Sequence, residues 1–174
     1  MGKRKNRHSG RKQMPDWVQR MLMGEGPSDW DAPRLGTRNL IFGNIWVGDK
    51  FAAASQWDRQ GWTVVDVREG SLTPSPAANV VHRPILEDDD TLPYASPTRL
   101  EAACTAIDAA LDAGQQVIVH CWQGLERSPL TLVYWLMTRQ GMDLSQAYAY
   151  VKAHRNVYDR RAWLKPRQPM GFAS

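Results

Sequence analysis

The amino-acid sequence predicts a single α/β domain in which helices cover a mostly parallel central sheet. Short β-branched runs, such as residues 62–67 and 117–119, alternate with amphipathic stretches of helical length over residues 38–160. At 174 residues, the chain is long enough for one such domain and too short for two. Its 43% hydrophobic and 23% charged residues are ordinary for a folded globular protein.

The N-terminal part is expected to contribute little to this domain. Residues 1–24 form a basic arm, expected to be disordered at its start because residues 1–13 have almost no apolar content, with a candidate short helix over 16–23. Residues 25–37 are rich in Gly, Pro and Asp and are predicted to be a loop. At the other end, residues 161–174 are predicted to be a basic C-terminal tail.

The first half of the domain is predicted to hold four strands and one helix. Residues 40–42 and 45–47 form a strand pair joined by a tight turn at Gly43-Asn44. A helix is expected over residues 50–60, where Phe51, Ala54 and Trp57 share one face. A strand over 62–67 is expected to be central. A further strand over 79–86 is placed nearer an edge, because Pro84 cannot donate to a ladder.

The second half is predicted to be mainly helical. An acidic loop over 87–97 precedes a helix over 98–113, closed by Gly114, with Cys104 as a small core side chain. A buried strand at 117–119 leads to a helix from Pro129 to Gln140, which Gly141 ends. A last helix begins after Asp143 and runs to Arg155.

The most informative segment lies between the last strand and the helix that follows it. Cys121 directly follows the apolar run, and Arg127-Ser128-Pro129 opens the helix, with Ser128 expected to cap it. Unpaired N–H groups and the helix dipole at such a start favour bound phosphate and would also favour a thiolate at Cys121. Arg127 could grip two phosphoryl oxygens with its planar fork. Gly124 allows the loop to turn. The segment therefore indicates a loop for nucleophilic attack on phosphorus.

The segment His120-Cys121, five residues, Arg127-Ser128 resembles the active-site loop of cysteine-dependent protein phosphatases, and the small size points to the dual-specificity group. Ile45–Asp49 is similar to that group's opening segment, and the similarity covers about residues 38–160. The resemblance implies a cysteine phosphatase-like fold and a cysteinyl-phosphate intermediate hydrolysed by water. It implies no metal and no cofactor.

The resemblance also implies a general acid on a loop ahead of the cysteine. Pro84–Asp88 matches the family's pattern loosely, with the Pro and Ile order exchanged, which makes Asp88 the first candidate, Asp89 the second and Asp90 the third. Three adjacent carboxylates disfavour one another's charged forms, which would help to keep one of them protonated. A solvated acidic turn without a catalytic part is the alternative.

The remaining loop residues are expected to bind substrate and to support the cysteine. His120 is implied to hold the loop, and Ser128 to hydrogen-bond the sulfur or assist water attack. Glu126 departs from the family, because a negative charge beside Arg127 weakens phosphate attraction unless it points away. The predicted substrate-binding residues are Trp122, Gln123, Gly124, Leu125, Glu126 and Arg127.

The charge distribution suggests partners for the two ends of the chain. Residues 1–20 carry seven Lys and Arg against one acid, and residues 151–174 carry six against one, whereas residues 21–150 carry nine against sixteen acids. Such basic ends are either solvated or bind RNA or another polyanion. No apolar run is long enough to span a membrane and no signal peptide is evident, so a cytoplasmic location is expected. The chain is also expected to be a monomer. Two cysteines give no disulfide framework and no zinc spacing.

Four functions fit the loop. The first is a phosphatase acting on phosphotyrosine and, as a further class, phosphoserine or phosphothreonine in proteins. An RNA 5′-triphosphatase or RNA phosphatase uses the same loop type and would be helped by the basic ends. A catalytically silent phosphate-binding module is favoured if Glu126 spoils the pocket. A rhodanese-like sulfurtransferase is disfavoured by the Arg-Ser-Pro exit and the acidic loop upstream.

Overall fold

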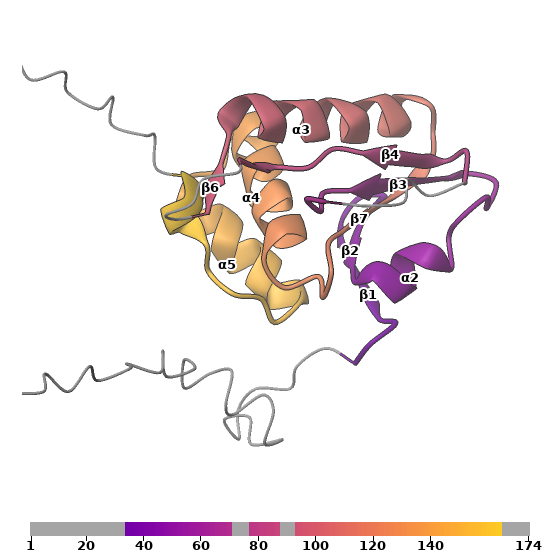
Figure 1. Cartoon of the computed structure of the whole chain (residues 1–174). Helices are drawn as coiled ribbons and strands as arrows, with labels where there is room; N and C mark the ends of the chain where they lie inside the picture. The colour runs from indigo at the N-terminus through magenta and orange to yellow at the C-terminus, as the bar shows by residue number, and fades with distance from the viewer. Residues whose placement is uncertain (1–33, 71–76, 88–92, 165–174) are drawn as a thin grey trace, which may run out of the picture. The chain divides into compact units, whose positions relative to one another are not determined.

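The computed structural model describes residues 34–70, 77–87 and 93–164 (Figure 1). The predicted basic arm with its candidate helix, the loop residues 25–33 and the tail residues 165–174 lie outside the described residues.

The domain contains a five-stranded sheet of order β1-β2-β7-β3-β4. The β1–β2 pair is antiparallel and the other three pairings are parallel, so the predicted mostly parallel sheet is confirmed. The strands are β1 (Arg38–Phe42), β2 (Ile45–Gly48), β3 (Trp62–Asp66), β4 (Val80–His82) and β7 (Gln116–His120).

The strand that precedes the cysteine loop, β7, is the middle strand of the sheet, between β2 and β3. Val117, Ile118 and Val119 are fully buried because both faces of the sheet are covered there. The predicted tight turn at Gly43-Asn44 joins β1 to β2, and Gly43 has the positive φ of 53° that such a turn requires. The predicted edge position before Pro84 is also confirmed, because β4 ends the sheet.

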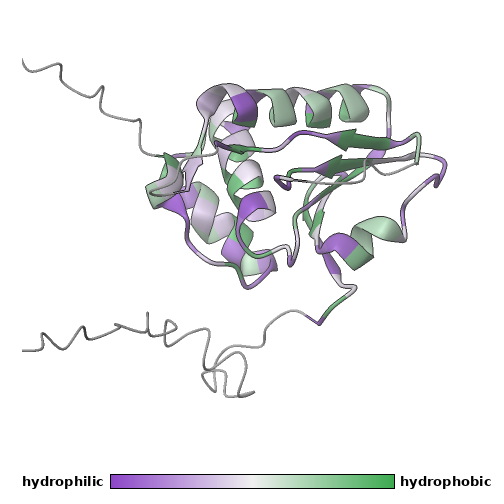
Figure 2. Cartoon of the chain, in the orientation of Figure 1, coloured by the Kyte–Doolittle hydropathy of each residue, from purple (hydrophilic) through white to green (hydrophobic). Residues whose placement is uncertain are grey.

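Helices cover the two faces of the sheet unequally (Figure 1). Helices α3, α4 and α5 pack with Val65, Val117 and Val119 into the larger core, whereas α2 packs with Val64 and Ile118 on the other face. Strand β3 is among the most hydrophobic segments, in keeping with its burial (Figure 2). The helices are α2 (Lys50–Ala54), α3 (Pro97–Asp112), α4 (Arg127–Gln140) and α5 (Leu144–His154).

The helix ends follow the local sequence signals. Gly114 follows α3 with a φ of 71°, and Gly141 ends α4 in the left-handed conformation that favours glycine. Asp143 caps α5 in a reciprocal capping box with Gln146. Cys104 is fully buried on α3, as predicted.

The predicted helix over residues 50–60 is wrong in length and in orientation. Helix α2 ends at Ala54 and buries Ala52 and Ala53, while Phe51 and Trp57 are 51% and 41% exposed. The Asn79 side chain explains the early end. Its amide nitrogen donates to the Gln56 and Trp62 carbonyl oxygens, and its oxygen accepts from the Asp58 N–H, so a distant side chain satisfies the turn.

The predicted strand over residues 79–86 is two strands. After β4, the chain leaves the sheet at Pro84 and forms the hairpin of β5 (Leu86–Glu87) and β6 (Tyr94–Ala95). Near the other end, the 3₁₀ helix η1 (Arg161–Leu164) lies beyond residue 160, and its Trp163 and Leu164 pack against the larger core. In the part of the chain described here, no helix is both long and apolar enough to cross a bilayer.

Candidate active site

The site begins where β7 ends. His120 is the last residue of β7, Cys121 follows it, and α4 starts at Arg127. Cys121 is 2% exposed, at the carboxyl end of the central strand. In parallel sheets covered by helices, this is the edge at which ligands bind.

The backbone of the loop after Cys121 is oriented by its surroundings. Four consecutive carbonyl oxygens accept hydrogen bonds from elements around the loop. The N–H groups of residues 122–126 have no hydrogen-bond acceptor among the described residues. The loop carbonyl groups thus face the surrounding elements of the fold. The N–H groups of the loop and the start of α4 are therefore left to bind an anion. The pairs are Trp122 with the Lys50 N–H (3.3 Å), Gln123 and Gly124 with Arg155 (3.3 and 3.0 Å), and Leu125 with the Tyr158 N–H (2.9 Å).

Gly124 is required by close packing as well as by its φ of 70°. A Cβ atom at this position would lie 2.5 Å from the carbonyl oxygen of Gly48 and 3.0 Å from a guanidinium nitrogen of Arg155. Neither backbone nor buried guanidinium can give way at that distance. The loop therefore rests directly on the end of β2.

Arg155, just after α5, holds the loop from behind. Its side chain is 3% exposed and donates to the Gly124 and Gln123 carbonyl oxygens and to the Asn39 side chain (2.8 Å). Burial lowers the pKa of Arg155, although Asp49 and Cys121 raise it. The fixed fork of a guanidinium suits such a junction of several acceptors.

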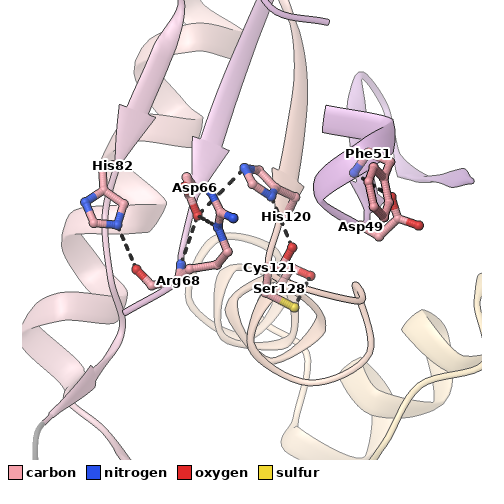
Figure 3. A network of polar contacts seen from close by, with 8 residues as sticks. All are labelled: Asp49, Phe51, Asp66, Arg68, His82, His120, Cys121 and Ser128. Atoms are coloured by element: carbon pink, nitrogen blue, oxygen red, sulfur yellow. Dashed lines mark hydrogen bonds and ion pairs between the residues drawn. The ribbon is translucent and has the colours of Figure 1, made fainter. Parts of the chain in front are cut away.

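Ser128 contacts the sulfur, as expected, but it does not cap the helix. Its hydroxyl is fully buried and donates to Sγ of Cys121 at 3.3 Å (Figure 3). The N-cap position is Glu126, which makes no side-chain capping bond, and Ser128 lies in the first turn of α4. The hydroxyl prefers the sulfur because the sulfur lies inside the fold, where a polar group needs a partner.

His120 belongs to a buried polar network at the ends of β7 and β3 (Figure 3). One ring nitrogen contacts the Cys121 carbonyl oxygen at 3.2 Å, and the other lies 3.7 Å from Asp66. Burial lowers the pKa of His120, although Asp66 opposes this shift. Burial alone would raise the pKa of Asp66, but two hydrogen bonds from the Arg68 guanidinium (2.6 and 2.8 Å) hold it below its usual value. His120 thus supports the loop as a neutral ring.

Arg127 is braced by a carboxylate that the sequence did not single out. Its Nε lies 2.5 Å from Oε2 of Glu69, a charge pair without the alignment of a hydrogen bond. The other Glu69 oxygen accepts from the Leu86 N–H at 3.0 Å. Within the described residues, the two terminal nitrogens of Arg127 have no acceptor, so they are available to a phosphoryl group.

Glu126 is paired with an arginine outside the loop. Arg160 donates to its carboxylate through two guanidinium nitrogens, one of them at 2.9 Å. Arg160 itself lies over the rings of Tyr158 and Trp163. The carboxylate is neutralised by its own partner, which answers the question that the sequence left open.

The predicted general acids lie outside the described residues. Asp88, Asp89 and Asp90 belong to residues 88–92, which connect β5 to β6. The described base of this hairpin is joined to the site because the Leu86 N–H donates to Glu69, and it is joined to α3 because the Leu86 carbonyl oxygen accepts from Arg99. The choice among the three aspartates stays a prediction.

Sequence reasoning missed four supporting residues, namely Asp66, Arg68, Glu69 and Arg155. The first three lie at the end of β3 and within three residues after it, so a cluster of charges at a strand end was the available signal. Arg155 carried no signal, because its burial depends on folding α5 back against the loop. Over residues 34–70, 77–87 and 93–164, no three His, Cys, Asp or Glu side chains gather as metal ligands.

These features define a cysteine-based phosphate site on an α/β fold. They are a buried cysteine, a loop whose carbonyl groups bond to the surrounding elements rather than facing the site, and an arginine at the start of the next helix. Residues 76–166, more than half of the chain, match the family model described as "Dual specificity phosphatase, catalytic domain". The chain belongs to this family.

Individual relatives agree with the family match. Human "Dual specificity phosphatase 28" is 31% identical over 120 residues, covering 66% of this chain and 65% of the relative. A "Putative tyrosine-protein phosphatase" of Acanthamoeba polyphaga mimivirus is 34% identical over 64 residues, covering 37% of this chain and 30% of the relative. The chain thus spans less than two thirds of the length of either relative.

Solved structures share the fold. Human DUSP28 is 26% identical with a TM-score of 0.53, over 75% of this chain and 84% of that chain. Tk-PTP in its active form is 25% identical with a TM-score of 0.57, over 75% and 90% of the two chains. The Cydia pomonella PTP-2 phosphatase, at 20% identity and a TM-score of 0.61 over 74% and 86%, matches in fold.

Proposed function

We propose that this chain is a cysteine-dependent protein phosphatase that hydrolyses phosphotyrosine and, as a further class, phosphoserine and phosphothreonine. The orientation of the catalytic loop carries this proposal. Its N–H groups, the start of α4 and the free nitrogens of Arg127 form one anion site beside the Cys121 sulfur. Family membership supports the same activity.

The reaction has two steps. The Cys121 thiolate attacks phosphorus, so an S–P bond forms while the P–O bond to the leaving group breaks, and an aspartic acid among residues 88–90 donates a proton to the departing oxygen. Water then attacks the cysteinyl phosphate while the same aspartate, now a carboxylate, accepts its proton, so that a P–O bond forms, the S–P bond breaks and inorganic phosphate leaves. In the second step, the Ser128 hydroxyl stabilises the departing thiolate through its 3.3 Å hydrogen bond.

The other functions receive less support from the site. A silent phosphate-binding module was favoured by an unpaired Glu126, but Arg160 pairs with that carboxylate. An RNA 5′-triphosphatase must bind several phosphates, and the loop between Cys121 and Arg127 contains no Lys or Arg. The basic ends that favoured RNA lie mainly outside the described residues.

A substrate panel tests the proposal. Phosphotyrosyl, phosphoseryl and phosphothreonyl peptides, a phosphoinositide and 5′-triphosphorylated RNA would be assayed with the wild type and with Cys121→Ser. Turnover of the phosphotyrosyl peptide, lost in Cys121→Ser while binding persists, is the expected result. Near-wild-type turnover by the variant would refute the covalent mechanism, and preferential turnover of the RNA or the lipid would refute the substrate class.

A further inference from the structure

Two exposed aromatic rings and a lysine lie beside the catalytic loop. Trp122, the residue after the nucleophile, is 45% exposed, and Phe51 at the start of α2 is 51% exposed. The Lys50 ammonium lies 5.1 Å from the Trp122 ring centroid and 4.9 Å from the Phe51 ring centroid. Lys50, Phe51 and Trp122 are here called the rim.

The rim is fixed to the loop by backbone contacts. The Lys50 N–H donates to the Trp122 carbonyl oxygen at 3.3 Å, which joins the start of α2 to the catalytic loop. Asp49, which is 1% exposed, caps α2 and also accepts from the Gly36 N–H. Figure 3 shows Asp49 and Phe51 on the other side of His120 and Cys121 from Asp66 and Arg68. The rim therefore keeps its place relative to Cys121.

Two cations approach Trp122 from the strands that flank β7. Lys50 follows β2, and the Arg68 guanidinium, which follows β3, lies 4.6 Å from the same ring centroid. Both positions are favourable for cation–π attraction. An indole held in this way keeps one orientation although nearly half of it is exposed.

The two cations differ in their remaining charge. Arg68 is neutralised by its double hydrogen bond to Asp66. Lys50 has no carboxylate partner among the described residues. Its ammonium is fixed by two rings that do not cancel its charge, so it remains free to bind an anion at the entrance of the site.

We propose that the rim selects phosphotyrosine in an acidic peptide. Trp122 and Phe51 contact the apolar parts of the substrate next to the phosphoryl group, and Lys50 pairs with a carboxylate beside the phosphorylated residue. This inference rests on the proposed phosphatase function and adds a sequence preference to it. Trp122, already expected to bind substrate, becomes with Lys50 a specificity-determining residue.

The charges at the rim favour a peptide over a nucleic acid. A single-stranded nucleic acid is held by a groove with several unpaired cations that follow its backbone. Here one of the two cations is already paired, and the carboxylates of Asp66 and Glu69 lie at and just beyond the end of the neighbouring strand β3. The unpaired ammonium of Lys50 can therefore pair with one carboxylate of a peptide substrate.

The test uses the full chain and three matched phosphotyrosyl peptides that carry Glu, Gln or Lys beside the phosphotyrosine. The wild type should prefer the Glu peptide in kcat/KM by about 2- to 5-fold at low salt, the usual range for an exposed ion pair, and less at high salt. Lys50→Met should bring the ratio to about 1. Lys50→Glu should reverse the preference toward a peptide with Lys at the same position.

Lys152→Met on α5 is the matched control, because it removes the same charge and should keep the wild-type ratio. A ratio that is the same in the wild type and in Lys50→Met would overturn the rim proposal while leaving the phosphatase function intact. Absence of turnover of any peptide by the wild type would instead refute the proposed function. Tighter binding of a 5′-phosphorylated oligonucleotide than of the Glu peptide, weakened by Lys50→Met, would overturn the choice of a peptide.

Discussion

The Glu69 carboxylate lies 2.5 Å from Nε of Arg127 and fixes the arginine that opens α4. The same carboxylate accepts from the Leu86 N–H, at the base of the hairpin that contains the predicted general acids. One side chain therefore connects the arginine expected to bind phosphate with the segment that leads to the predicted proton donor. Its removal should affect transition-state binding rather than folding alone.

Glu69→Gln should lower kcat/KM on an aryl phosphate by about tenfold, equivalent to about 1.4 kcal/mol of transition-state stabilisation. If the amide oxygen keeps the Leu86 bond, the amide NH₂ faces Arg127, where two donors cannot pair. Steady-state kinetics with vanadate inhibition measures the effect. Glu101→Gln is the control, because it removes a carboxylate on α3 that pairs with Arg139 on α4. Equal kinetics in both variants would contradict the bracing role of Glu69.

Arg155→Met should destabilise the protein and the loop together. It leaves the Gly124 and Gln123 carbonyl oxygens without their donors, and a buried unpaired acceptor costs about 1–3 kcal/mol. Urea unfolding should show this loss, and turnover should fall in the fraction that remains folded. The exposed residue Arg161, changed to Met, should stay within about 0.5 kcal/mol of the wild type. A stability loss with unchanged kcat would mean that Arg155 supports the fold but not the loop.

Glu126→Gln should leave vanadate inhibition unchanged within about twofold, because Arg160 already neutralises the carboxylate. Arg160→Met should weaken inhibition by freeing that negative charge beside Arg127. The double variant should restore it. Inhibition constants at low salt for all four proteins complete the cycle. Much tighter inhibition in Glu126→Gln alone would show that the carboxylate acts on the bound anion.

His120 should make stability fall as the pH drops below 6.5. Burial lowers its folded-state pKa, so just below 6.5 the unfolded chain binds more protons and acid favours unfolding. The Asp66 contribution is lost only below pH 3.8, because that pKa is also lowered from its ordinary value. Urea unfolding at pH 7 and pH 5.5 should therefore show a smaller change for His120→Asn than for the wild type. The exposed His154, changed to Asn, is the control.

The local part of the site could be predicted because its signals are contiguous. Thirteen consecutive residues predict a strand from their β-branched run, a loop from Cys121 and Gly124, and a helix start from Arg127. The structure brings these residues together at the end of β7. The role of Ser128 at the sulfur was within reach for the same reason. Its assignment as a cap failed because a hydroxyl near a helix start has two possible partners, and only the fold decides between them.

The supporting part could not be predicted because it depends on contacts between distant segments. Glu69 and Arg127 are 58 positions apart in the sequence, and Arg155 reaches Asn39 across 116 positions. The end of α2 also depends on a distant segment, because the Asn79 side chain hydrogen-bonds to the backbone of the turn that follows this helix. Helical periodicity in residues 50–60 carries no information about such a partner.

The position of Arg155 also bears on when the proposed activity could arise during synthesis of the chain. A nascent chain that has emerged through α4 already contains Cys121 and Arg127, but Arg155 is still unfolded or untranslated, and the Gly124 and Gln123 carbonyl oxygens lack their guanidinium. The same side chain reaches back to Asn39, so closing the loop joins the first strand to the segment after the last long helix. On the ribosome, we expect the nucleophile to be present well before it is competent, which delays phosphate hydrolysis until the domain has been released almost whole.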